Sequence, residues 1–274
     1  MSQTESEPRS IVDGTTIESK SVPAIRIPRA ADTVDQTEEW CEVCVDGDWR
    51  RVRFHDYDEI FAIPGLYETL FHDTLECASP ERVVAMLAAC IEDAFEKPEG
   101  LRVLDVGAGN GLVGERLRDL GVESIVGVDI IPEARDAALR DRPGLYDEYL
   151  ACDLTALTER QRRSLEEHRC NAMTTVAALG FNDIPPRAFA AAYNLLEAPA
   201  WVAFNLNENF LDGADDSGFA RLVRAMQRDG VLETSAYQRY PHRLGIDGEW
   251  LRYVAIIGRK LRDIPEDMLA EAEG

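Results

Sequence analysis

The sequence has no run of about 18 uninterrupted apolar residues, which is the length that a membrane-spanning helix needs. It begins with a polar stretch that contains two glutamates, whereas a secretory signal begins with positive charge followed by apolar residues. The six cysteines are scattered through 274 residues, which is typical of reduced thiols and not of a disulfide framework. These absences predict a soluble, cytoplasmic protein with no membrane partner.

Basic residues are also scarce. Lys and Arg number 29 against 51 Asp and Glu, so the formal net charge is −22. Nucleic-acid binding depends on Lys and Arg that neutralise phosphates, and the balance therefore predicts no nucleic-acid partner. Cys41 and Cys44 have half the spacing of a zinc site, but no second pair follows, so no metal is predicted. Apolar residues make up 45% of the chain, enough for a sizeable core.

The patterning divides the chain into four segments. Residues 1–38 are polar without a lasting period and predict a disordered tail. Residues 39–97 predict a hairpin followed by helices, one of which begins with Ser79 as N-cap and Pro80 at the first helical position. An α/β body is expected over 98–262 and an acidic C-terminal tail over 263–274.

Short apolar runs alternate with helical patterns throughout the body. This alternation predicts right-handed crossovers and a mostly parallel sheet with helices on both faces. The last two runs, 232–240 and 251–258, are joined by a turn-rich segment and predict an antiparallel pair at one edge. The expected parallel strands are 101–106, 124–128, 149–152, 171–178 and 200–206.

A glycine-rich loop follows the first strand of the body. Its sequence, GAGNG at 107–111, lets a ligand approach the backbone at the positive end of a helix. Asp129 ends the next strand, 22 residues after Gly107, where a carboxylate can accept hydrogen bonds from two ribose hydroxyls. The loop therefore predicts an adenosine-like ligand. A dinucleotide fingerprint needs its third glycine where Leu112 stands, and Asp105 would crowd a pyrophosphate, so a nicotinamide oxidoreductase is disfavoured.

Three motifs carry a resemblance to a known family. The segments VLDVGAGNG (103–111), VGVDI (126–130) and ACDL (151–154) resemble, in order, the first three motifs of the class I S-adenosylmethionine-dependent methyltransferases. The resemblance covers about residues 100–260. It implies a Rossmann-like fold with a seven-stranded sheet, S-adenosylmethionine (SAM) as cofactor and S-adenosylhomocysteine (SAH) as product.

The resemblance also implies roles for single residues. The loop glycines would surround the methionine part of SAM, Asp129 would hold the ribose, and Asp153 with Leu154 would frame the adenine. Asp105 could anchor a water or receive an ammonium group. The implied cofactor-binding residues of the three motifs are Asp105, Gly107, Ala108, Gly109, Asn110, Gly111, Asp129, Ile130, Asp153 and Leu154.

The segment before the body resembles the lid of small-molecule methyltransferases. Many such enzymes carry an N-terminal tyrosine-bearing helix that closes over the cofactor, and Tyr57 and Tyr67 lie at matching places. Aromatic rings there could shield a sulfonium by charge–quadrupole attraction. The alternative is that both tyrosines are ordinary core aromatics.

Candidates for the methyl-transfer step are few. Displacement at a sulfonium methyl needs positioning and, for a hydroxyl or a protonated amine, a base. Among the four histidines, His55 flanks the predicted lid and His242 lies in the terminal pair of strands. Asn182 and Asp183 follow the fourth strand and could orient an acceptor, although the same residues suit an ordinary loop or helix cap before Pro185.

A further absence limits the acceptor. Amino-methylating members that act on nucleic-acid bases or glutamine carry an Asn/Asp-Pro-Pro-aromatic motif after strand four, and this chain has AALG at 177–180 instead. We therefore expect methylation of an O, N or C atom of a small organic acceptor such as a natural product. The alternatives are a protein methyltransferase and a non-catalytic SAM-binding scaffold.

Overall fold

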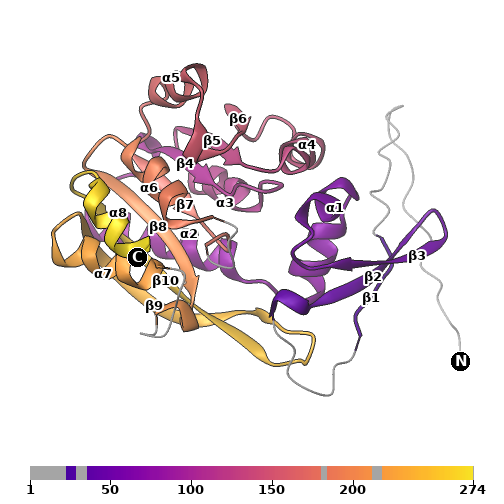
Figure 1. Ribbon diagram of the computed structural model, residues 1–274. Coiled ribbons are helices and arrows are strands. Elements are labelled where there is room, and N and C mark those ends of the chain that lie inside the picture. Colours follow the sequence, from indigo (N-terminus) through magenta and orange to yellow (C-terminus); the bar gives the residue numbers. More distant parts are fainter. Residues whose placement is uncertain (1–22, 29–35, 180–183, 212–217, 274) are drawn as a thin grey trace, which may run out of the picture.

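A seven-stranded sheet forms the centre of the computed structural model, which describes residues 23–28, 36–179, 184–211 and 218–273 (Figure 1). The strand order is β6-β5-β4-β7-β8-β10-β9, and β10 alone among these strands runs antiparallel to both of its neighbours. The predicted mostly parallel sheet with an antiparallel C-terminal pair is confirmed. The strands are β4 (Arg102–Val106), β5 (Ser124–Asp129), β6 (Glu148–Ala151), β7 (Ala172–Thr175), β8 (Ala200–Asn207), β9 (Leu232–Leu244) and β10 (Trp250–Lys260).

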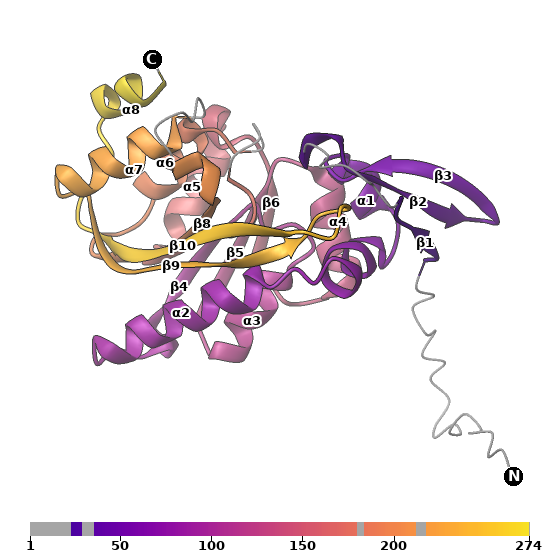
Figure 2. The same ribbon diagram turned by 90° about the horizontal axis from the view of Figure 1, so that it is seen from below.

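Helices cover both faces of this sheet (Figure 2). Successive side chains of a strand point to opposite faces, so Leu104 and Val106 join one apolar cluster while Val103 joins the other. The first face is covered by α5 (Glu159–Glu167), α6 (Pro186–Asn194), α7 (Phe219–Arg228) and α8 (Glu266–Glu273). The second is covered by α2 (Ser79–Asp93) and α3 (Leu112–Leu120), and α4 (Pro132–Asp141) packs beside β5 and β6. Three 3₁₀ turns connect these elements, η3 (Pro98–Gly100), η4 (Leu154–Ala156) and η5 (Glu208–Leu211).

The N-terminal segment forms a unit with its own apolar core. The strands β2 (Trp40–Val45) and β3 (Asp48–Arg53) form a hairpin at the residues for which the sequence predicts one, and β1 (Ile25–Arg26) adds a third strand. The 3₁₀ turn η1 (Gln36–Glu38), helix α1 (Tyr57–Ala62) and a π-helix, η2 (Glu68–Thr74), complete the unit. It packs through α1 against α4, at the carboxyl edge of the parallel strands.

Two segments differ from the tails that the sequence predicts. Within 1–38, Ile25 pairs with Val43 of β2, because an edge strand offers unpaired backbone groups to any extended segment beside it. Within 263–274, α8 packs on the core because Met268, Leu269 and Ala272 form one buried apolar stripe. No helix within the described residues has the length and apolar character needed to cross a membrane.

The start of α2 also differs from expectation. Ser79 is the first helical residue and not the N-cap, a position that Ala78 occupies without a side-chain hydrogen bond. The reason is that the Ser79 hydroxyl is used elsewhere, since it lies 2.6 Å from both Tyr240 Oη and His242 Nδ1. The hydroxyl therefore ties α2 to β9.

Candidate functional site

The glycine loop between β4 and α3 has a backbone that other residues rarely adopt. Gly107, Gly109 and Gly111 have φ of +68°, +55° and +95°. A Cβ on Gly107 would lie 2.6 Å from Cβ of Ala178, which is closer than such atoms approach. The loop is thus held against the segment after β7, and its backbone stays open to a ligand.

Asp129 lies at the end of β5, beside this loop. One carboxylate oxygen accepts a hydrogen bond from the Gly109 N–H and the other from the Ile131 N–H, each at 3.0 Å. Burial raises the pKa of Asp129, and the backbone donors Ile131 and Gly109 oppose that shift. The carboxylate is therefore fixed in direction and ready to accept further hydrogen bonds from a ligand.

A cavity of about 300 Å³ opens at the carboxyl edge of β4, β5 and β6, and we refer to it as the first cavity. A volume of this order is that of a small-molecule site. Most of the predicted cofactor-binding residues meet there. Those that line it are Tyr57, Tyr67, Gly107, Gly109, Asp129, Ile130, Asp153 and Leu154.

Four predicted residues do not line the first cavity. Ala108 and Asn110 line a small cavity of about 30 Å³ on the other side of the loop. Gly111 packs closely against the Leu145 side chain, because a Cβ at this position would lie 2.8 Å from Leu145 Cδ2. Asp105 is only 1% exposed and does not line the first cavity, which corrects the expectation that it contacts the cofactor.

The carboxylate of Asp105 is already occupied by protein groups. The Thr174 hydroxyl donates to one oxygen at 2.7 Å, and the Tyr146 hydroxyl donates to the other at 2.9 Å. Burial raises the pKa of Asp105 to about 6. These two hydrogen bonds connect β4 to β7 and to the segment before β6. The role of Asp105 is therefore structural.

Aromatic rings of the N-terminal unit form one wall of the first cavity. Phe61 stacks on Tyr67 at a centroid distance of 5.0 Å and on Tyr57 at 6.1 Å. Both tyrosines line the cavity, and Phe61, which is not among the predicted residues, lies between them. The signal was available, because Phe61 follows Tyr57 by one helical turn and therefore shares its face.

Polar contacts fasten this wall to the glycine loop. The Glu68 carboxylate accepts hydrogen bonds from Asn110 Nδ2 at 2.8 Å and from the Arg142 guanidinium at 2.9 Å. The same guanidinium donates to the Asn110 carbonyl at 3.1 Å. Asn110 therefore connects the loop to the N-terminal unit.

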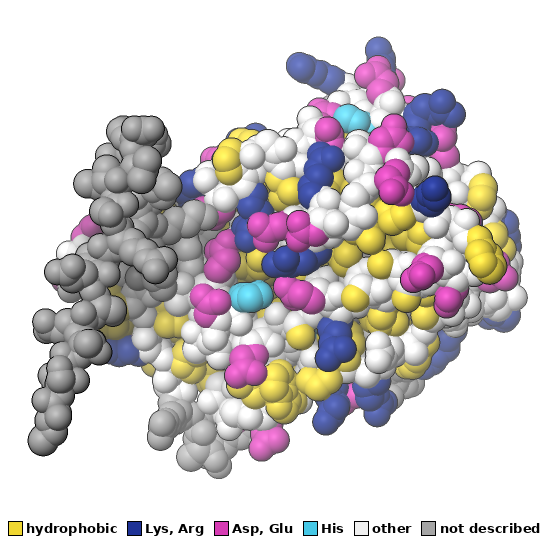
Figure 3. Space-filling model, turned by 180° about the vertical axis from the view of Figure 1, so that it is seen from behind, with side chains coloured by type: hydrophobic (Ala, Val, Ile, Leu, Met, Phe, Trp, Pro, Cys, Tyr) yellow, Lys and Arg dark blue, Asp and Glu magenta, His cyan; other side chains and the backbone are white. Residues whose placement is uncertain are grey.

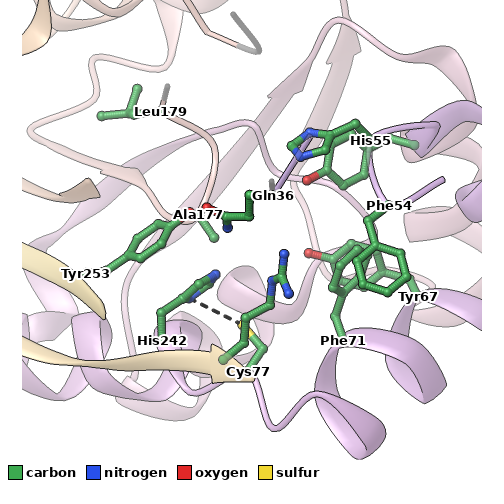
Figure 4. A pocket seen from close by; sticks show the side chains of 12 residues that line it. Gln36, Phe54, His55, Tyr67, Phe71, Cys77, Ala177, Leu179, His242 and Tyr253 are labelled. Atoms are coloured by element: carbon green, nitrogen blue, oxygen red, sulfur yellow. Dashed lines mark hydrogen bonds between the residues drawn. The ribbon is translucent and has the colours of Figure 1, made fainter. Parts of the chain in front are cut away.

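A second cavity, of about 30 Å³, adjoins the first (Figure 4). The two share Tyr57, Tyr67 and Ala177, so they meet at these side chains. The second cavity lies between the N-terminal unit and strands β9 and β10. Its polar lining comes from Gln36, His55, Cys77, His242 and Arg243.

Both histidines predicted for the reaction line the second cavity. His242 is 4% exposed, and burial together with the nearby Arg243 guanidinium puts its pKa well below the usual value. The pKa of His55 is lowered for the same two reasons, burial first. Burial raises the pKa of the Cys77 thiol to about 11. At neutral pH both rings are thus neutral and the thiol is protonated.

Other predicted features lie elsewhere. Asn182 and Asp183 fall outside the described residues. In the part of the chain that the structure describes, no group of three His, Cys, Asp or Glu residues could hold a metal. Arg243 and Cys77 were not predicted from the sequence, because nothing in their local sequence shows that β9 and the segment before α2 meet across a cavity.

The sequence matches a family of methyltransferase domains over residues 81–246, which is more than half of the chain. No curated protein matches the sequence.

Two solved structures share the fold. The protein solved in complex with the Trm112 methyltransferase activator of Haloferax volcanii is 16% identical, with a TM-score of 0.52 over 76% of this chain and 98% of that one. The N-methyltransferase NodS from Bradyrhizobium japonicum WM9, solved with SAH, is 12% identical, with a TM-score of 0.50 over 76% of this chain and 97% of that one. At these identities the likeness shows the fold.

Proposed function

The chain belongs to the family of SAM-dependent methyltransferase domains, and we propose that it transfers the methyl group of SAM to a small organic acceptor that places one group in the second cavity. The observation that carries this proposal is that the two cavities meet at Tyr57, Tyr67 and Ala177. An acceptor in the second cavity would face a cofactor in the first across these side chains.

The residues of the first cavity fit the cofactor. SAM supplies an electrophilic methyl group on a positively charged sulfur. Asp129 would accept hydrogen bonds from the ribose hydroxyls, and Asp153 with Leu154 would lie against the adenine. Gly107 and Gly109 leave the loop backbone open to the methionine part. Tyr57 and Tyr67, with the Phe61 ring between them, would exclude water and present aromatic faces to the positive charge.

His55 is the proposed base on the wall of the second cavity. Its lowered pKa keeps the imidazole neutral at pH 7, so it can accept a proton from a hydroxyl or ammonium group of the acceptor. For an acceptor that is already ionised, positioning alone would suffice.

Two observations support a small acceptor over a macromolecule. The second cavity has room for only one or two water-sized groups and lies beneath the N-terminal unit. The chain carries 51 acidic against 29 basic residues, and on the face shown in Figure 3 the two kinds are interspersed. On these grounds we also propose that nucleic acid is not the substrate.

The acceptor class can be tested without knowing the acceptor. The protein is incubated with methyl-labelled SAM and a cell extract, and the extract is then separated by size. We expect the label in the low-molecular-weight fraction, with no transfer by the Asp129→Ala variant. Label in the protein or RNA fraction would contradict the proposed acceptor class. SAH binding without any transfer would favour the non-catalytic scaffold.

A further inference from the structure

His242 is oriented by contacts on one edge of its ring. It lies on β9, and its ring packs on Tyr253 at a centroid distance of 3.9 Å. Nδ1 is 2.6 Å from Ser79 Oγ and 3.8 Å from Cys77 Sγ. The opposite edge, which carries Nε2, points into the second cavity (Figure 4). The position of the ring proton therefore decides what His242 offers to a ligand.

Ser79, which contacts His242 Nδ1, belongs to a hydrogen-bond network that includes the Asn205 amide. Its Oδ1 accepts from the Ala177 N–H at 2.6 Å, which fixes the orientation of the amide. Its Nδ2 therefore donates to Ser79 Oγ at 3.0 Å and to Tyr240 Oη at 2.6 Å. Both hydroxyls thus already accept one hydrogen bond.

The remaining protons of this network can be placed by counting. Among the described residues, the Tyr240 hydroxyl has one other partner, Ser79 Oγ at 2.6 Å, so its proton goes there. Ser79 Oγ then accepts two hydrogen bonds and donates its own proton to His242 Nδ1. Because Nδ1 accepts, the single proton of the neutral ring is on Nε2.

Arg243 adds further donors to the same cavity. One terminal nitrogen of its guanidinium donates to Glu39 at 2.5 Å and the other to the Leu244 carbonyl at 2.8 Å. Its other N–H groups have no hydrogen-bond partner among the described residues. The second Glu39 oxygen accepts from the Ile246 N–H at 2.8 Å, so both oxygens of this carboxylate are engaged by neighbouring groups, although each keeps a further lone pair.

We propose that His242 Nε2–H and the Arg243 guanidinium bind an oxyanion of the methyl acceptor, in particular a carboxylate. This inference rests on the proposed function, because it takes the second cavity as the acceptor site. The cavity volume of about 30 Å³ suits one such group, with the rest of the acceptor outside it. His242 is thus a donor that positions the acceptor. This role differs from the base that the sequence suggests, since a protonated Nε2 has no lone pair to accept a proton.

The tautomer can be observed directly in the full-length protein. The chain has only four histidines, so a long-range proton–nitrogen NMR spectrum of ¹⁵N-histidine-labelled protein with saturating SAH resolves them, and the His242→Gln variant assigns the signal. We expect Nε2 protonated and Nδ1 unprotonated at pH 7. A proton on Nδ1, or an imidazolium ring, would overturn the inference.

Acetate serves as the probe for the oxyanion, and methylammonium is the control of similar size and opposite charge. We expect acetate to shift the His242 Nε2 signal saturably and methylammonium to leave it unchanged. Tyr240→Phe removes the hydroxyl that forces the tautomer, so two tautomers should be populated. With equal populations the donor form is halved, and acetate should bind about twofold more weakly. His168→Gln, a histidine paired with Glu148 away from the cavity, should leave the response unchanged.

The outcomes separate this inference from the proposed function. A His242 signal that ignores acetate, or responds equally in Tyr240→Phe, would overturn the inference while the cofactor assignment stands. Calorimetry on the same sample measures SAH binding independently. Failure to bind SAH together with the expected tautomer would count against the cofactor site and leave the donor assignment of His242 intact.

Discussion

The first and second cavities share three side chains and yet are built in different ways. Apart from the aromatic rings of the N-terminal unit, the first cavity is lined by residues 106–188, which belong to successive strands and the segments that follow them. The second joins the N-terminal unit to β9 and β10, so that Ser79 and His242 meet across 163 residues of sequence. The first cavity is therefore set by local βα geometry, whereas the second cavity depends on tertiary packing.

The strongest test of the first cavity as the cofactor site is removal of the Asp129 carboxylate. Asp129→Ala should weaken SAH binding about 100-fold, because hydrogen bonds from two ribose hydroxyls to a charged carboxylate would be lost. Titration calorimetry measures the affinity. Asp136→Ala is the matched control, since this aspartate is exposed on α4 and should bind SAH like the parent protein.

One result would contradict this assignment. An unchanged SAH affinity in a folded Asp129→Ala variant would remove the ribose assignment. Because Asp129 also accepts hydrogen bonds from the Gly109 and Ile131 backbones, a thermal melt of each variant should accompany the titration. Asp129→Asn keeps one acceptor oxygen and should fall between the two affinities.

A smaller effect is expected at the junction of the two cavities. Tyr67→Ala should weaken SAM binding about tenfold, since a ring near a sulfonium contributes on the order of 1 kcal/mol in addition to its packing. SAH has no positive sulfur, so its affinity should fall less. Tyr67→Phe keeps the ring and should preserve the preference for SAM.

Tyr237 provides the control for this junction. It is 58% exposed on β9, and Tyr237→Ala should change both affinities by less than about twofold. Equal losses in the two alanine variants, or equal losses of SAM and SAH in Tyr67→Ala, would contradict the charge-shielding role. The fold of each variant is checked by its melting temperature.

The sheet could be predicted from sequence because its signals are local. Alternating apolar runs and helical patterns indicate a parallel sheet, and GAGNG between a strand and a helix indicates the ligand loop. The pairing of Ile25 with Val43 and the packing of α8 could not be predicted in this way. Both depend on surfaces that exist only once the other elements have assembled.

In the candidate site, too, some residues could be placed from local sequence and others could not. The position of Asp129 at the edge of the first cavity follows from the length of one βαβ unit. The burial of Asp105 does not, because it depends on Thr174 and Tyr146 reaching its oxygens from other elements. Similarly, the pattern that suggests Ser79 as a helix cap contains no sign of Tyr240 or His242, whose distant hydrogen bonds engage its hydroxyl instead.

A crystal structure of the chain with SAH bound would test the central claim most directly, because the claim is one of placement. We predict that the ribose hydroxyls lie on the Asp129 carboxylate and that the sulfur lies beside Ala177, facing the second cavity. SAH bound outside the first cavity, or with its sulfur directed away from Ala177 and His242, would contradict the assignment of the two cavities to cofactor and acceptor.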